Sequence, residues 1–135
     1  MASGMLFDPA LTMAQTALKG LELRRDVISQ NIANVDTPGY QAQAVDFETS
    51  LQRAMNAGGD LPLSTTNQRH INGSGLDGNN IYTTSPRDGG STRADENNVD
   101  ISQEMEQMTE TTLSYEALTS TITKKLSLLK TIAER

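Results

Sequence analysis

The chain of 135 residues contains no cysteine and no tryptophan, and aromatic residues make up only 4% of it. Without cysteine there are no disulfide bonds and no thiolate chemistry, which suits an exported protein as well as a cytosolic one. Because hydrophobic residues reach only 36% of the sequence, a large globular core is not expected. The length fits one domain, or a small domain with an arm.

Positive charge and long hydrophobic runs are also scarce. The formal net charge is −6, which argues against nucleic acid and anionic membranes as main partners. The sequence has no apolar run of the roughly 18 residues that a membrane-spanning helix needs, so no direct membrane span is predicted. Residues 1–8 lack a basic segment followed by a hydrophobic one, so they are predicted to form a tail and not a cleavable signal peptide.

Residues suited to catalysis or metal binding are few. His70 is the only histidine, and without cysteine or a second histidine it is interpreted as an ordinary loop residue. The stretch 77–80 resembles a calcium loop only faintly, because the spaced ligands and the final glutamate are missing. The acidic residues between 95 and 110 fit a solvated helix start better than a catalytic carboxylate pair. With no phosphate-binding loop, nucleophile elbow or dinucleotide fingerprint, the sequence predicts a protein that is not an enzyme, with no catalytic, cofactor-binding or metal residues.

What the sequence does contain is a pair of long heptad patterns. The first begins at Asp8, a plausible N-cap, and predicts a helix over residues 9–35 that is about 40 Å long. Gly20 lies off its packing seam and is expected to cost about 1 kcal/mol relative to alanine. Arg25 lies on the seam, where either its aliphatic stem snorkels to solvent or its charge is paired and fixes the register. The seam residues, spaced by three and four, are Leu11, Ala14, Leu18, Leu21, Ile28, Ile32 and Val35.

The second pattern predicts a helix over residues 101–133, about 50 Å long. Asp100 and the three residues after it resemble a capping box, and glutamates early and lysines late in the stretch match the helix dipole. The predicted seam consists of Ile101, Met105, Met108, Tyr115, Ile122, Leu126 and Leu129. Four apolar residues beside that seam would stay exposed in a two-helix pairing, so further helices are expected to cover them: Leu113, Leu118, Leu128 and Ile132.

Between the two patterns the chain must turn sharply. Proline at position 38 lacks the N–H that a helix needs and disfavours helical geometry at Thr37, whereas Gly39 accepts positive φ. Residues 40–45 are compatible with extended structure. A short helix is predicted from the cap residue Asp46, with one apolar face and an end at two glycines: Phe47, Leu51, Ala54 and Met55, then Gly58 and Gly59.

The following segment, residues 57–98, changes composition. It holds seven of the ten glycines and only eight apolar residues. The best strand candidate in it is 81–84, and a hairpin or two in a loose insert is the interpretation. Such a segment buries too little apolar surface to fold strongly alone.

The predicted fold class is therefore mainly α. Residues 9–35 and 101–135 form an antiparallel coiled-coil pair, 1–8 a tail, and 36–100 a central linker with a short helix and a Gly-rich loop or β-hairpin insert. Two helices make a single layer, whereas stable domains have at least two. The missing layer is expected from other copies or other proteins.

The turn and the second helix also carry a resemblance to a known family. The stretch 31–40, through Asn31, Ala33, Asn34, Thr37, Pro38, Gly39 and Tyr40, resembles the N-terminal signature of the rod and hook axial proteins of the bacterial flagellum. The stretches 99–105, 113–115 and 124–129 resemble the C-terminal helix of that family. Together the matching parts cover about the first 55 and the last 38 residues, and the insert offers no comparable motif.

This resemblance implies a structural subunit of the flagellar basal-body rod, and the short length fits the proximal rod better than hook or distal-rod relatives. Its implied partners are copies of itself, other rod proteins, the adaptor at the rod base and the membrane-ring protein. It also implies passage through the flagellar type III export apparatus without a cleaved signal, and assembly in the periplasm. The residues alone leave a second hypothesis, a soluble coiled-coil adaptor or secretion chaperone that binds a partner helix, in which the stretch 31–40 has no specific purpose.

Overall fold

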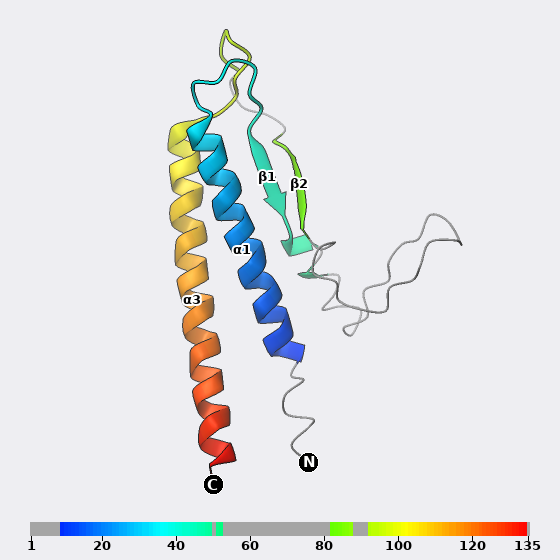
Figure 1. The fold of residues 1–135 in the computed structure, drawn as a ribbon, viewed down its shortest axis with the longest axis vertical. Coiled ribbons are helices and arrows are strands. Elements are labelled where there is room, and N and C mark those ends of the chain that lie inside the picture. Colours follow the sequence, from blue (N-terminus) through cyan, green and yellow to red (C-terminus); the bar gives the residue numbers. More distant parts are fainter. Residues whose placement is uncertain (1–8, 50, 53–81, 88–91, 135) are drawn as a thin grey trace, which may run out of the picture.

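Two long helices dominate the structure, a computed structural model that describes residues 9–49, 51–52, 82–87 and 92–134. Helix α1 (Pro9–Ala33) and helix α3 (Ile101–Ala133) run antiparallel and in contact. A ribbon of two strands, β1 (Gln43–Asp46) and β2 (Thr83–Pro86), lies along α1 (Figure 1). The start of α1 and the end of α3 point to the same pole, and the connections gather at the other. The predicted fold class, mainly α with an antiparallel helix pair, is confirmed.

The bounds of the helices follow from their caps. The predicted start of α3 is confirmed, because the carboxylate of Asp100 accepts hydrogen bonds from the backbone N–H groups of Ser102 and Gln103 at 2.9 and 3.3 Å. Helix α1 ends at Ala33, two residues before the predicted end. There the backbone changes to tighter bonds, such as that from the N–H of Val35 to the carbonyl of Ile32 at 3.3 Å, and the chain enters the turn that Pro38 requires.

The ribbon differs from the predicted insert in its pairing. β1 and β2 are antiparallel, with Val45 opposite Thr84 and Asp46 opposite Thr83. The extended structure expected over 40–45 is confirmed from Gln43 onward. The strand predicted at 81–84 is observed at Thr83–Pro86, and it pairs with a strand that precedes the insert instead of forming a hairpin inside it. Any further hairpin between 53 and 81 lies outside the described residues.

The short helix expected after Asp46 is described only at its start. The Asp46 carboxylate accepts bonds from the N–H and hydroxyl of Thr49 at 3.4 and 3.3 Å, so its predicted capping role is confirmed. Residues 48–49 and 51–52 are helical. Ala54, Met55 and the two glycines predicted to end this helix lie outside the described residues.

A small core lies where α1 meets the ribbon. Leu21, Val27, Val45 and Phe47 are buried together, and parts of α3 pack around them. Gly20 is also buried, and a Cβ atom at this position would lie 2.5 Å from Cγ of Phe47. This glycine, interpreted from the sequence as a tolerated defect, is the notch that receives the aromatic ring.

Helix α3 is rotated relative to the predicted seam. Its most buried positions are Glu104 and Thr111, which the sequence places beside the seam. Three predicted seam residues are instead about half exposed: Ile101 at 46%, Met105 at 54% and Leu126 at 48%. The remaining ones, Met108, Tyr115, Ile122 and Leu129, are half-buried. Helix α1 thus covers the side of α3 that carries Glu104 and Thr111 instead of the centre of the predicted seam. Glu104 faces inward because it bonds Asn31 and Arg87, and these polar partners cannot be inferred from the spacing of hydrophobic residues.

The seam on α1 agrees better with the prediction. Leu21 and Ile28 are buried, and the other seam residues within the helix are half-buried. The guanidinium of Arg25, which is exposed, lies over the ring of Tyr115 on α3 at 5.9 Å from the ring centroid. This cation–π contact joins the two helices and was anticipated by neither interpretation of Arg25.

Candidate functional site

The chain turns at a corner made by residues 31–42 and 93–99, at the pole where the connections gather. Gly39 has φ +72°, as the Pro-Gly sequence predicts, and its N–H donates to the carbonyl of Asp95 at 2.8 Å. Glu96 on the facing segment also has positive φ, at 65°. Each of the two connections thus contains one residue with left-handed backbone, and Gly39 is bonded to the residue that precedes Glu96.

Asn31 fastens three elements at this corner. Its side chain is fully buried. The amide nitrogen donates to the carbonyl of Gln43 at 2.8 Å and to the carboxylate of Glu104 at 3.2 Å. Its amide oxygen accepts from the N–H of Gln43 at 2.9 Å and from the hydroxyl of Tyr40 at 3.1 Å. One side chain on α1 thereby holds β1 and α3 in place.

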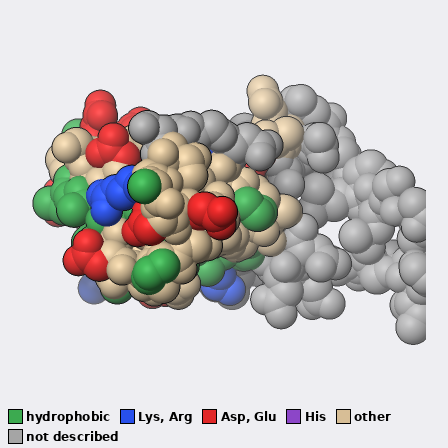
Figure 2. Space-filling view, turned by 90° about the horizontal axis from the view of Figure 1, so that it is seen from above, with side chains coloured by type: hydrophobic (Ala, Val, Ile, Leu, Met, Phe, Trp, Pro, Cys, Tyr) green, Lys and Arg blue, Asp and Glu red, His purple; other side chains and the backbone are tan. Residues whose placement is uncertain are grey.

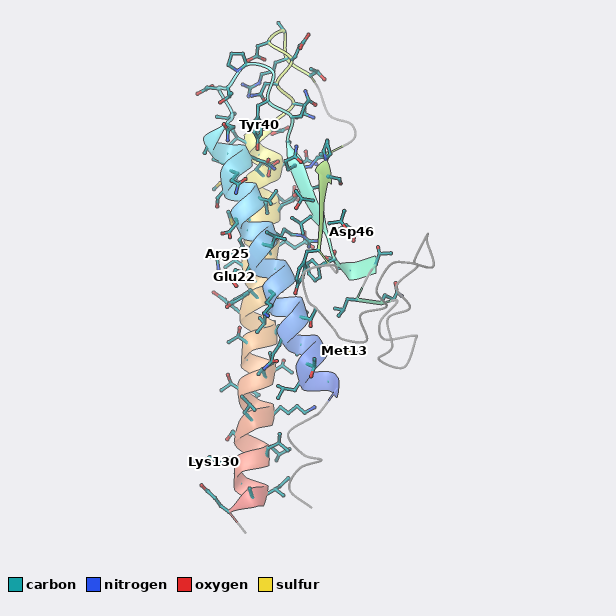
Figure 3. The ribbon with its side chains drawn as sticks, turned by 45° about the vertical axis from the view of Figure 1, so that its right-hand side comes forward. Met13, Glu22, Arg25, Tyr40, Asp46 and Lys130 are labelled. Atoms are coloured by element: carbon teal, nitrogen blue, oxygen red, sulfur yellow. The ribbon has the colours of Figure 1, made fainter. Side chains whose placement is uncertain are left out.

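Tyr40 can donate this hydrogen bond to Asn31 only while its hydroxyl is protonated. Burial, and secondly the negative charge of Glu104, raises the pKa of Tyr40 above its ordinary value. The hydroxyl therefore stays neutral at physiological pH and keeps donating to Asn31. Figure 3 shows Tyr40 where α1 gives way to the connection.

Asn97 closes the end of α1 from the opposite segment. It is fully buried, and its amide nitrogen lies 2.9–3.0 Å from the carbonyls of Asn34, Val35 and Thr37. Its amide oxygen accepts from the N–H of Val99 at 2.8 Å. The last carbonyls of a helix lack intrahelical partners. Asn97 supplies a partner to the turn that follows α1, from more than 60 residues away in the sequence.

A buried ion pair ties the ribbon to α3. The guanidinium of Arg87, directly after β2, donates to the carboxylate of Glu104 at 2.6 Å and to the side-chain carbonyl of Gln107 at 3.0 Å. Side-chain exposure is 14% for Arg87 and 0% for Glu104. A buried carboxylate costs several kcal/mol unless it is paired and hydrogen-bonded. Because Asn31 bonds the second oxygen of Glu104, both oxygens are satisfied.

The structure brings the predicted signature together only in part. Asn31 and Tyr40 point inward, and Asn34 accepts the hydroxyl of Thr37 at 3.1 Å. Ala33 and Pro38 are exposed. Sequence reasoning missed Asn97 within the corner, and it missed Arg87 and Glu104, which bond the elements beside it. The signal for Glu104 was a charge at a heptad position on the flank that faces α1, and it was read as a dipole effect.

The described residues of the corner show no unpaired buried polar side-chain group and no metal-binding cluster. Among the described residues, no buried side-chain nitrogen or oxygen lacks a hydrogen-bond partner. The same part of the chain holds no group of three histidine, cysteine or acidic side chains that could bind a metal ion. A cavity of about 280 Å³ between α1, β1 and α3 is lined partly by Arg24, Arg87 and Glu110. Both arginines are already engaged in ion pairs, so these groups hold geometry.

Among the described residues, the large apolar side chains that remain exposed lie on α3. The large apolar side chains exposed there are Ile101, Met105, Leu113, Leu126, Leu128 and Ile132. The C-terminal part of α3 continues past the first residue of α1 (Figure 1). From above the corner, by contrast, the described surface is mostly polar, and its hydrophobic side chains form separate patches (Figure 2). Within the described residues, no helix is long and apolar enough to cross a membrane.

Comparison with known proteins places these features in a family. A family profile described as flagella basal body rod protein matches residues 11–41, the span from the first turn of α1 through the Gly39 turn. The chain is 32% identical over 127 residues to the flagellar basal body rod protein FlgB of Bacillus subtilis (strain 168), across 94% of this chain and 95% of that protein. The chain belongs to the FlgB family. FlgB of Aeromonas hydrophila is 34% identical over 130 residues, across 93% and 94% of the two chains. FlgB of Escherichia coli (strain K12) is 43% identical over 68 residues, 47% of this chain and 49% of that protein.

Membership in the FlgB family establishes the broad function. The chain is a structural subunit of the flagellar basal-body rod and not an enzyme, as the sequence predicts. A rod protein assembles with other rod subunits. The corner residues therefore serve to set the relation between two long helices, and the exposed face of α3 is the candidate surface for assembly.

Proposed function

We propose that this FlgB-family chain is a subunit of the proximal rod whose two terminal helices pack in coiled-coil fashion with helices of neighbouring subunits. The observation that carries the proposal is the row of predicted seam residues that α1 leaves uncovered. Met105 and Leu126 are 54% and 48% exposed although they repeat at heptad spacing with the half-buried seam. An exposed heptad row on a long helix favours contact with a further helix.

The immediate neighbours that we propose are copies of this chain, other rod proteins, the adaptor at the rod base and the membrane-ring protein. We further propose that the subunit reaches the periplasm through the flagellar type III apparatus without a cleaved signal. The Gly-rich composition of residues 57–98 and the small core among the described residues support this route, because a chain with little packed structure unfolds easily before passage.

The corner contributes rigidity to the proposed assembly. Asn31, Asn97 and Glu104 are fully buried and fully bonded, so the two helices leave this pole in one fixed relation. A rod built from repeated contacts needs identical subunits, because a variable helix crossing would change the surface that each neighbour meets. We infer that Asn31 and Tyr40 of the signature serve this geometric purpose.

A test uses one seam residue and its neighbour on the chain. Leu126→Asp places a carboxylate on the face that the proposal buries, at a cost of several kcal/mol when it is desolvated. Ser127→Asp places the same charge one position off the seam. In a strain that lacks its own rod subunit, Leu126→Asp should be exported but be depleted from purified basal bodies, whereas Ser127→Asp should be incorporated and restore motility.

The outcome also separates the rod subunit from the adaptor hypothesis. If both variants enter basal bodies as well as the parent chain does, the proposed seam is wrong. If the parent chain stays in the cytosol as a soluble complex with a partner helix, the adaptor hypothesis replaces the proposed assembly.

A further inference from the structure

The side of α3 turned away from α1 carries two exposed rows of mostly polar side chains, each spaced by seven residues. The first row contains Ser102, Thr109, Glu116, Thr123 and Lys130, and the second contains Gln103, Glu110, Ala117, Lys124 and Thr131. At 3.6 residues per turn the two rows lie about 100° apart around the helix. α3 therefore offers two different flanks, one on either side.

The threonines of these rows are prepared for burial. The hydroxyls of Thr109, Thr123 and Thr131 each donate to a carbonyl four residues earlier in the helix, at 2.9, 2.9 and 3.0 Å. A hydroxyl that is bonded within its own helix leaves its methyl group to face outward. A neighbouring helix can cover such a residue without stranding an unpaired donor. At these three threonines the rows are thus less polar than their composition indicates.

The first row also borders a hollow. A shallow depression of about 490 Å³ runs along α3 and is lined by Tyr115, Glu116, Thr119, Ser120, Thr123 and Lys124. Among these residues Thr119, Ser120 and Thr123 are small, and they leave room for a side chain of a neighbouring helix.

The distribution of charge along α3 favours one register for a parallel second copy. Exposed acidic residues lie in the first half of α3, at Glu106, Glu110 and Glu116, and exposed lysines lie in the second half, at Lys124 and Lys130. A parallel copy displaced by six residues would place Glu116 next to Glu110 and so set like charges against each other. A parallel copy displaced by eight residues, about 12 Å, brings Glu116 beside Lys124 and avoids this repulsion.

We propose that α3 of one copy packs its first row against the second row of α3 in the next copy, parallel and displaced by eight residues. This register places Thr109 beside Ala117, Glu116 beside Lys124, and Thr123 beside Thr131. The contact joins two different flanks, so it is heterologous and each copy keeps a free flank for a further one. The inference rests on the proposed rod assembly and specifies which faces of two copies meet.

Lys130 lies on the first row, seven residues after Thr123. It is near the far end of α3 (Figure 3), and its carboxylate partner Glu134 is 3.8 Å away, with side-chain exposure of 76% and 67%. An exposed pair of this kind contributes little to stability. The proposed register rests on Glu116 and Lys124 and does not depend on Lys130.

Because the chain has no cysteine, disulfide trapping can read the register directly. We would express Thr109→Cys/Ala117→Cys as the only copy in flagellated cells, oxidise purified basal bodies and resolve the products on a non-reducing gel. Within one helix the two sites are about 12 Å apart, too far for a disulfide, so every product joins two copies. The expected result is a ladder of dimers and higher oligomers, repeated by Thr123→Cys/Thr131→Cys.

A matched control keeps the rows and changes the register. Thr109→Cys/Thr131→Cys should give no ladder. If the expected pairs give none although the variants are present in basal bodies, or if Thr123→Cys/Lys124→Cys gives the ladder instead, the proposed register is overturned. If the parent chain itself is missing from basal bodies, the rod assembly fails and the register with it.

A charge exchange tests the same contact without crosslinking. Glu116→Lys and Lys124→Glu should each lower incorporation about two- to fivefold, as expected for loss of one exposed ion pair. The double exchange should restore it. Two single variants that incorporate normally would contradict the ion pair on which the register depends.

Discussion

The substitution Gly20→Ala tests whether helix propensity or packing dominates at this position. Helix propensity predicts a gain in the free energy of unfolding, and packing predicts a loss. In an open helix the substitution stabilises by about 1 kcal/mol. Here the new Cβ atom would lie 2.5–2.7 Å from three ring carbons of Phe47, including Cγ, which cannot move without the whole ring. Inserting a methyl group into a packed core costs about 1–3 kcal/mol. Displacing the ring, which is only 3% exposed, forfeits part of a further 1.5–3 kcal/mol.

The net expectation for Gly20→Ala is a loss of about 1–3 kcal/mol in the free energy of unfolding. Urea unfolding of the free chain, followed by far-ultraviolet circular dichroism, measures it. Ser29→Ala, at an exposed position of α1, is the control for propensity and should be neutral or slightly stabilising. Combining Gly20→Ala with Phe47→Leu should recover part of the loss. A gain of about 1 kcal/mol for Gly20→Ala alone would refute the notch.

Three further predictions concern the corner and the ribbon. Gly39→Val should lower the free energy of unfolding by about 1–2 kcal/mol because φ is +72° there, whereas Gly39→Asn, which tolerates that conformation, should cost less; equal losses in urea titrations would remove the backbone argument. Glu104→Leu alone strands Arg87 and should cost about 3–5 kcal/mol, while Glu104→Leu with Arg87→Met should be close to neutral; a double variant as unstable as the single one would show that the pair is not the cause. For Glu48, burial raises the pKa. The hydrogen bond and charge of Arg24, together with backbone hydrogen bonds, lower the pKa by more than burial raises it, so the pKa of Glu48 lies below its ordinary value. This carboxylate therefore stabilises the fold above its unfolded pKa and loses that effect as pH falls through its folded pKa, so Glu48→Gln should flatten the acid limb of stability against pH, and an unchanged limb would contradict it.

The sequence predicted the elements that depend on local signals. The bounds of α3 follow from Asp100 as a cap and from an uninterrupted heptad pattern, and Gly39 follows from a proline that ends a helix. Those signals act within a few residues, so they do not need the rest of the fold. The early end of α1 was missed by two residues because the last turn tightens before Pro38, which periodicity does not show.

The features that were missed depend on residues far apart in the sequence. Gly20 is a notch only because Phe47 folds back onto α1. Glu104 is buried only because Asn31 and Arg87, 73 and 17 residues away, meet at its two oxygens. A rule that places hydrophobic residues inside therefore assigned the wrong flank of α3 to the intramolecular contact. The heptad row that was wrongly assigned to this contact, with Met105 and Leu126, is exposed in the structure, and it is the row that the assembly is proposed to use.

The central claim is that the exposed row of α3 becomes buried when the subunit enters the rod. Thr119 lies on that row and is exposed in the free chain, and Thr121, exposed as well, lies on another side of α3. The decisive measurement is the maleimide labelling rate of Thr119→Cys, with Thr121→Cys as reference, in the free chain and in purified basal bodies. We predict that Thr119→Cys reacts readily in the free chain and becomes protected in basal bodies. Equal labelling of Thr119→Cys in both states, with the chain present in the basal bodies, would contradict the account.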